Sequence, residues 1–150
     1  MASQIETILD EIAAWEPTYD TETVKCWNID DVRPNLEPSQ VPRRILGLAD
    51  DSEFSFVALG KRGSITWRIL DTLYIAPAGE LAVYRRHYGD MVRYAAKYAD
   101  AALADRGLIT GTQQAHVVAV TFTHGTFAYP EGSDNLFLGV QAELEVQEII

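Results

Sequence analysis

The 150-residue sequence has one cysteine, Cys26, and lacks most features that identify an enzyme or a membrane protein. A single cysteine excludes an intrachain disulfide framework and a paired-cysteine metal site, and it suggests synthesis in a reducing compartment. No apolar run approaches the roughly 18 residues that span a bilayer. The N-terminal stretch MASQIETILDEIAAWE is acidic and has no basic region. We therefore predict no secretory signal and a cytoplasmic place of synthesis.

Motifs that hold phosphates or metals are also missing. The nearest glycine-rich stretch, LGKRGS, is typical of a hairpin turn rather than of a phosphate-binding loop. His116 and His124 lie about 26 Å apart along an extended strand, and His87 follows two arginines. Because metal sites need clustered ligands, we predict no metal and no cofactor. Cys26 has no histidine near it in sequence, which favours a small buried side chain over a nucleophile.

Basic residues are scarce, and the net charge of −10 is unevenly distributed. Residues 1–60 carry a net charge of −8, residues 61–110 carry +3, and residues 111–150 carry −5 with no Lys or Arg. Tight binding to nucleic acid depends on neutralising phosphates with basic side chains. The chain is therefore a poor candidate for gripping DNA, although an acidic surface would let DNA slide past.

Two helices are predicted. Ser3 and Glu6 have the spacing of a capping box, and apolar residues then follow helical spacing up to Trp15, before Pro17. A long helix is expected from about Glu80 to Ala104, with Gly107 as its C-cap.

Strands account for most of the remaining pattern, because runs rich in β-branched and aromatic residues alternate with turn formers. The predicted strands are Thr23–Trp27, Arg43–Leu48, Phe54–Leu59, Ser64–Ala76, Ala115–Phe127 and Leu136–Ile149. Adjacent strands form hairpins, and one long helix crosses between them. The order predicts a single α+β domain over residues 1–150: a mostly antiparallel sheet with an N-terminal helix and one long helix packed on one face.

The last predicted strand is strongly one-sided. Its even positions from Leu136 to Val146 are apolar, and its odd positions include Glu143 and Glu145. Asp71 interrupts an otherwise apolar face of the Ser64–Ala76 strand. An interior Asp71 would favour a pocket lined by Tyr84, Tyr88, Trp67 and His116, whereas an Asp71 at a subunit interface or at the rim would not.

Four basic residues form a stripe on the long helix, and they are Arg85, Arg86, Arg93 and Lys97. The stripe is either a solvated face helped by nearby aspartates or a docking surface for an acidic neighbouring subunit.

Three aromatic residues flank the polar loop between the last two strands, and they are Phe127, Tyr129 and Phe137. They either contact a partner or close the hairpin.

Taken in order, these elements resemble the tail terminator proteins of long-tailed bacteriophages. The similarity rests on the opening helix IETILDEIAAW, the segment PSQVPRRILGL, the strand ITWRILDTLYIA with its following helix YRRHYGDMVRYAAKYADAAL, and the final pair AHVVAVTFTHGTF and LFLGVQAELEVQE. It covers most of the chain as a pattern. The proline-rich stretch 28–42 and the loop 127–137 match no motif of that family.

The resemblance implies a structural protein of the virion rather than an enzyme. Members form a hexameric ring on the finished tail tube, stop its polymerisation and present a surface to the head-side neck or connector protein. Such a ring is assembled in the host cytoplasm, does not contact a membrane and lets DNA through without specific binding. The final strand would close the sheet, with Glu143 and Glu145 facing solvent or the channel.

Two alternatives stay open. Related neck and head–tail joining proteins share a similar element order. A small α+β domain with an internal ligand or active site is the alternative from a different functional class.

Overall fold

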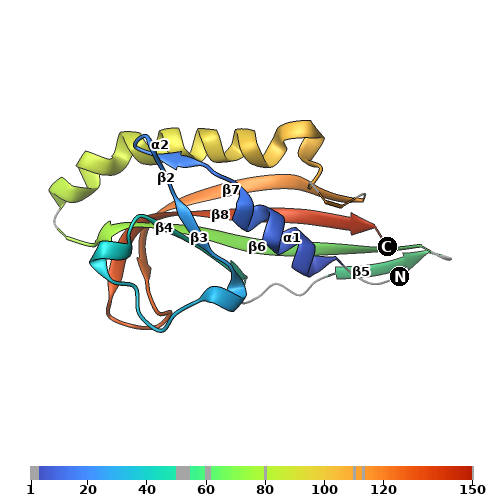
Figure 1. The fold of residues 1–150 in the computed structure, drawn as a ribbon, viewed down its shortest axis with the longest axis horizontal. Coiled ribbons are helices and arrows are strands. Elements are labelled where there is room, and N and C mark those ends of the chain that lie inside the picture. Colours follow the sequence, from blue (N-terminus) through green and yellow to red (C-terminus); the bar gives the residue numbers. More distant parts are fainter. Residues whose placement is uncertain are drawn as a thin grey trace.

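A computed structural model describes residues 4–49, 55–59, 62–79, 81–109, 111–112 and 114–149, with side chains omitted for 55–59, 62 and 81–83. The fold is α+β, as predicted, with two helices on a mostly antiparallel sheet (Figure 1). The strands run β3 (Lys25–Trp27), β4 (Arg43–Leu48), β6 (Arg62–Pro77), β8 (Leu136–Ile149) and β7 (Ala115–Ala128) in spatial order, and β5 (Ser55–Leu59) pairs with one end of β6. β3 and β4 are parallel, and the other pairs are antiparallel.

The last strand is central in this sheet. β8 pairs with β6 along one side and with β7 along the other. The expectation that the final strand closes the sheet is therefore wrong. Its one-sided pattern is confirmed, because Val140, Leu144 and Val146 are buried while Glu145 is exposed. Because β8 is a central strand and one of its faces is polar, the side of the sheet that carries Glu143 and Glu145 has little cover.

Helix α1 (Ile5–Ala14) lies against the sheet because Ile8 and Ile12, one turn apart, are both fully buried. Gln4 is the N-cap residue, and its side chain makes no capping hydrogen bond. The predicted capping box depends on Ser3, which lies outside the described residues.

Helix α2 (Leu81–Leu103) covers the same face of the sheet. Its buried residues recur at spacings of three and four, and they are Met91, Tyr94, Tyr98 and Ala102. The helix continues into a 3₁₀ turn, Ala104–Gly107, in which Gly107 has a φ of +79°. A Cβ at Gly107 would lie 2.3 Å from the carbonyl oxygen of Val117, so only glycine fits where this turn meets β7.

The segment between α1 and β4 has more structure than its prolines suggest. A two-residue hairpin joins β1 (Thr18–Tyr19) to β2 (Glu22–Thr23), and both of its turn residues have positive φ. The predicted strand near Thr23–Trp27 is β3, and 3₁₀ turns occupy Ile29–Asp31 and Pro38–Gln40. This segment therefore wraps around one edge of the sheet instead of forming one long loop.

Apolar side chains form two separate clusters. The larger lies between the sheet and both helices. The smaller lies on the other face, at the end where the loop after β7 meets the segment before β4, and its buried members are Trp27, Leu36, Ile45, Tyr74, Tyr129 and Phe137. One face of the sheet is thus covered by helices, and the other is covered at one end only.

Candidate functional site

The open face of the sheet carries the two acids that the sequence assigned to a channel. Glu143 lies opposite Leu70 on β6, and Glu145 lies opposite Arg68. Both alternate with the buried residues of β8, so they point away from α1 and α2. Arg68 forms an ion pair with Glu143 at 2.9 Å, with both side chains partly exposed. This pair is therefore a solvated surface contact, and Glu145 beside it adds a negative charge.

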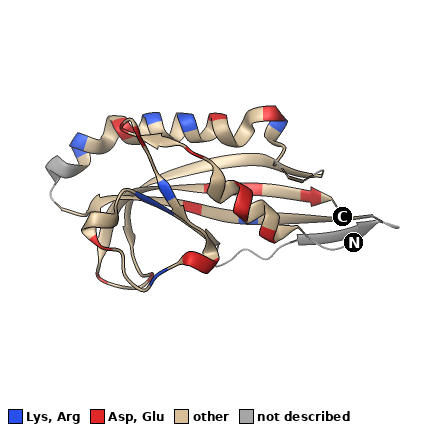
Figure 2. Cartoon of the chain, in the orientation of Figure 1, with Lys and Arg blue, Asp and Glu red and all other residues tan. Residues whose placement is uncertain are grey.

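The four basic residues of α2 are all exposed. Figure 2 shows basic positions along α2 with acidic positions between them, and further acidic positions on α1 and on the 3₁₀ turn that holds Asp30 and Asp31. Arg93 pairs with Asp90 one turn away, and Lys97 donates a hydrogen bond of 2.9 Å to Thr18 Oγ1. Arg93 and Lys97 thus lie on the flank of α2 that faces β1. Both interpretations of the stripe stay predictions.

The loop aromatics lie mostly inside the protomer. Tyr129 and Phe137 are 6% and 5% exposed and pack edge-on against Tyr74, with ring centroids 5.6 and 5.8 Å apart. The Tyr129 hydroxyl donates a hydrogen bond to the Arg33 carbonyl oxygen. Burial beneath these rings raises the pKa of Tyr74 to about 12. These two rings hold the loop onto the sheet and leave little surface for a partner. Phe127 is only half-buried.

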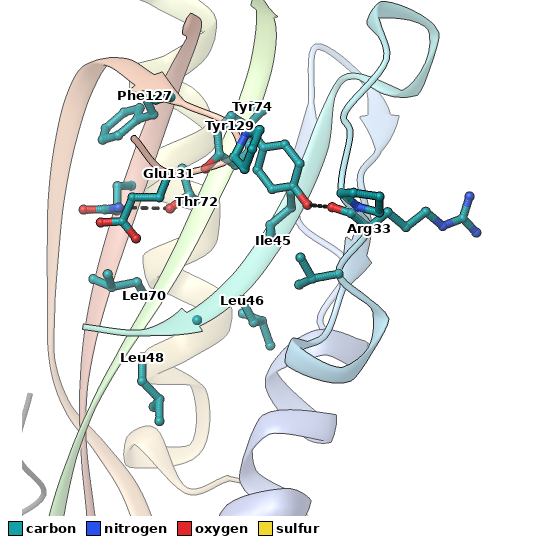
Figure 3. Close-up of a pocket in the computed structure, with 16 residues that line it drawn as sticks. Arg33, Ile45, Leu46, Leu48, Leu70, Thr72, Tyr74, Phe127, Tyr129 and Glu131 are labelled. Carbon is teal, nitrogen blue, oxygen red and sulfur yellow. Dashed lines mark hydrogen bonds between the residues drawn. The ribbon is translucent and has the colours of Figure 1, made fainter. Parts of the chain in front are cut away.

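Phe127 faces a groove on this side of the sheet (Figure 3). The groove has a volume of about 610 Å³ and lies between β4, β6 and the loop after β7. Its floor is formed by residues such as Ile45, Leu70 and Thr72, and Gln141 Nε2 donates to Thr72 Oγ1 at 3.0 Å. Its rim includes Arg33 and Glu131. The volume is in the range of small-molecule pockets, but the groove is open rather than enclosed (Figure 3).

Asp71 lies on the opposite, helix-covered face and is fully buried. Arg44 Nε donates to Asp71 Oδ2 at 3.0 Å, Arg44 Nη2 donates to the same oxygen, and the Tyr98 hydroxyl donates to it at 2.6 Å. Burial alone would lower the pKa of Arg44, but the attraction of Asp71 outweighs it and keeps that pKa above its ordinary value. The sequence identified Asp71 as unusual but gave no reason to pair it with Arg44.

Arg44 also holds the end of α1. Its Nη1 and Nη2 groups donate to the carbonyl oxygens of Trp15 and Ile12, at 2.7 and 2.9 Å. The last carbonyls of a helix lack partners within the helix, and a cation is favourable there. At the other end of α1, the buried carboxylate of Glu148 accepts a bond of 2.6 Å from the Gln4 backbone N–H and one of 3.0 Å from Trp67 Nε1. Two buried side chains of opposite charge therefore fix α1 at both ends.

The remaining reactive side chains are separated in the structure. Burial raises the pKa of the Cys26 thiol to about 12, which keeps it protonated at neutral pH. His87 bonds to Tyr19 at 2.7 Å, and His124 bonds to Tyr84. Within the part of the chain that the structure describes, no three His, Cys, Asp or Glu side chains lie close enough to hold a metal ion.

The side chains that the sequence suggested as a pocket lining, Tyr84, Tyr88, Trp67 and His116, have their contacts in different parts of the structure. Tyr84 and Tyr88 stack around His124 on β7, whereas Trp67 bonds to Glu148 near the N-terminus of α1. His116 pairs with Gln147 in the strand register. Tyr84 and Tyr88 therefore lie on α2 near His124, which pairs with Val140, whereas Trp67 and His116 lie at the other end of β8, beside Val146 and Gln147.

Neither described helix has the length and hydrophobicity to cross a membrane. Comparison with models of known protein families found no match, and comparison with curated proteins found none either.

Proposed function

We propose that this chain is a structural protein of a long-tailed bacteriophage, which forms a hexameric ring on the finished tail tube. The ring would stop tube polymerisation and join the tail to the head-side neck or connector protein. It would be assembled in the host cytoplasm and remain in the virion at the tail or neck. The proposal rests on the resemblance of the element order and, in the structure, on one observation: Glu143 and Glu145 lie on a sheet face that no described helix covers.

A ring with this face toward its axis would have an acidic lumen. DNA carries one phosphate charge per strand every ~3.4 Å, and basic side chains are what bind it tightly. Carboxylates on the lumen would therefore let DNA pass without holding it. Arg68 offsets Glu143 through their ion pair, and Glu145 keeps the lumen negative. This supports a passive role for the channel.

A non-enzymatic role is part of the proposal. Both oxygens of the buried Asp71 lie within hydrogen-bond distance of Arg44, and the groove lies on the opposite face of the sheet. A function based on a pocket around Asp71 would need Asp71 and the groove to be connected, and the sheet separates them. Another neck or head–tail joining component remains the alternative within the same class, because it would share the ring and the acidic lumen.

The first test is the solution mass and the shape of the particle. Light scattering after size exclusion, at low and moderate salt, should give six protomers of 16.7 kDa, a ring of about 100 kDa. Electron microscopy should then find an annular particle with a central hole. A chain that stays monomeric at both salt concentrations contradicts the proposal.

The second test concerns the lumen. Glu143→Lys with Glu145→Lys should give an assembled ring that retains double-stranded DNA in a salt-dependent way, whereas the wild-type ring does not. Glu6→Lys with Glu16→Lys is the matched control, because it makes the same charge change at exposed sites on the α1 side. Equal DNA retention by both variants would mean that the open face does not line the channel.

A further inference from the structure

Large exposed apolar side chains gather at two opposite edges of the sheet. Tyr88, Val92 and Leu103 lie on α2 and are 48–56% exposed, and Val118 lies on the adjacent strand β7. Ile29, Val32 and Leu48 lie at or before β4 and are 36–45% exposed. The strand order puts β7 at one edge and β3 with β4 at the other. We name these surfaces the α2 edge and the β4 edge.

The α2 edge is unusual because its strand carries no charge. β7 has no Lys, Arg, Asp or Glu from Ala115 to Ala128, and past Val117 its outer side pairs with no strand among the described residues. Proteins ordinarily protect such an edge with charged side chains or proline, because an open edge recruits another chain. Tyr88 extends the surface from β7 onto α2, with its ring 5.7 Å from that of His124.

The β4 edge borders a groove. Val32 and Leu48 both line the 610 Å³ groove. β3 pairs with β4 only from Arg43 to Ile45, so the outer side of β4 near Leu48 has no strand beside it in the described chain.

The segments that carry the two edges also differ in net charge. Residues 81–128, which form α2 and β7, hold five basic and three acidic side chains, a net charge of +2. Residues 4–49, which form α1 and the strands up to β4, hold four basic and nine acidic side chains, a net charge of −5. Two copies of a chain with net charge −10 repel each other in most orientations. Bringing the α2 edge of one copy to the β4 edge of another places segments of opposite net charge next to each other, which reduces that repulsion.

We infer that copies of this chain associate head to tail, with the α2 edge of one protomer packed against the β4 edge of the next and Val92 directed into the groove beside Leu48. The contact joins two different surfaces of the same chain, and a contact of this kind generates a ring when the rotation between successive copies closes. The inference rests on the proposed function and specifies the subunit contact. The next protomer would cover the groove, whose floor includes Leu70 opposite Glu143, so the open face would be covered at its groove end.

Two single substitutions test the contact. Val92→Asp and Leu48→Asp each introduce a carboxylate into an apolar interface, where an unpaired charge is costly. Each variant should reduce the particle from about 100 kDa to the 16.7 kDa protomer, with an unchanged circular dichroism spectrum. Leu136→Asp is the matched control, because Leu136 is 46% exposed against 43% for Leu48 and lies outside both edges. It should leave the assembly intact.

Mixing the two variants gives the decisive result. Each Val92→Asp copy keeps an intact β4 edge, and each Leu48→Asp copy keeps an intact α2 edge, so the mixture should stop at a dimer of twice 16.7 kDa. If wild type assembles and both variants assemble equally well, or if Leu136→Asp also dissociates the particle, the inference is overturned while the ring function stands. If wild type stays monomeric, both fail, and the groove is then free to be tested with an apolar fluorescent dye.

Discussion

The two faces of the sheet each carry an arginine–carboxylate pair that involves strand β6, and the surroundings of the two pairs are opposite. Arg44 and Asp71 are both fully buried under the helices. Arg68 and Glu143 lie on the open face, with side chains 46% and 35% exposed. The same chemistry therefore holds the fold together on one face and leaves a solvated, adaptable surface on the other. The comparison teaches that burial decides whether an ion pair has a structural role.

The buried pair also has more partners. Arg44 binds two carbonyl oxygens at the end of α1, and Tyr98 supplies a further donor to Asp71. A buried charge that loses its partner is strongly destabilising, whereas exposed pairs contribute little. The three predictions that follow test this contrast, from the largest expected effect to the smallest.

Asp71→Ala should lower the free energy of unfolding by about 3–5 kcal/mol, because it leaves the Arg44 guanidinium buried without its counter-charge. Urea denaturation followed by tryptophan fluorescence measures the change. Replacing the pair by Arg44→Met with Asp71→Leu should recover only part of the loss, since the α1 carbonyls of Ile12 and Trp15 would then lack their donor. Full recovery would mean that Arg44 does not stabilise the end of α1.

Tyr98→Phe should cost about 1.5–3 kcal/mol, the value of a hydrogen bond to a charged group. Tyr94→Phe is the control one turn away on the same helix, because the buried Tyr94 hydroxyl lies near Arg44 but makes no hydrogen bond of normal geometry with the described residues. That control should change stability by less than about 0.5 kcal/mol or raise it slightly. Equal losses in the two variants, compared by thermal and urea unfolding, would contradict a specific role for Tyr98.

Arg68→Ala should change the free energy of unfolding by less than about 1 kcal/mol, because its pair with Glu143 is solvated. The small effect should shrink further at high salt, which screens exposed charges. Urea denaturation at two salt concentrations measures it. A loss of stability as large as that of Asp71→Ala would mean that the Arg68–Glu143 pair on the open face is shielded from solvent.

Much of the fold could be predicted because its signals are local. The strand Arg43–Leu48 and the strand Leu136–Ile149 have the bounds given by their apolar alternation and flanking turns. The long helix was placed within about a residue at each end, since its buried spacing is regular. The candidate site was harder to predict from the sequence. The exposure of Glu143 and Glu145 followed from the alternation of β8. The burial of Tyr129 and Phe137 depended on a distant segment that carries Trp27.

The sequence by itself determined which residues form helix and strand and which face of each is apolar, because these depend on side-chain order within a few turns or pleats. Only the tertiary structure decided that β8 lies between β6 and β7, that Arg44 meets Asp71, and that Glu148 and Arg44 hold the two ends of α1. These contacts join residues 27 to 144 positions apart. They are set by which strands become neighbours, and no periodicity in the chain encodes that choice.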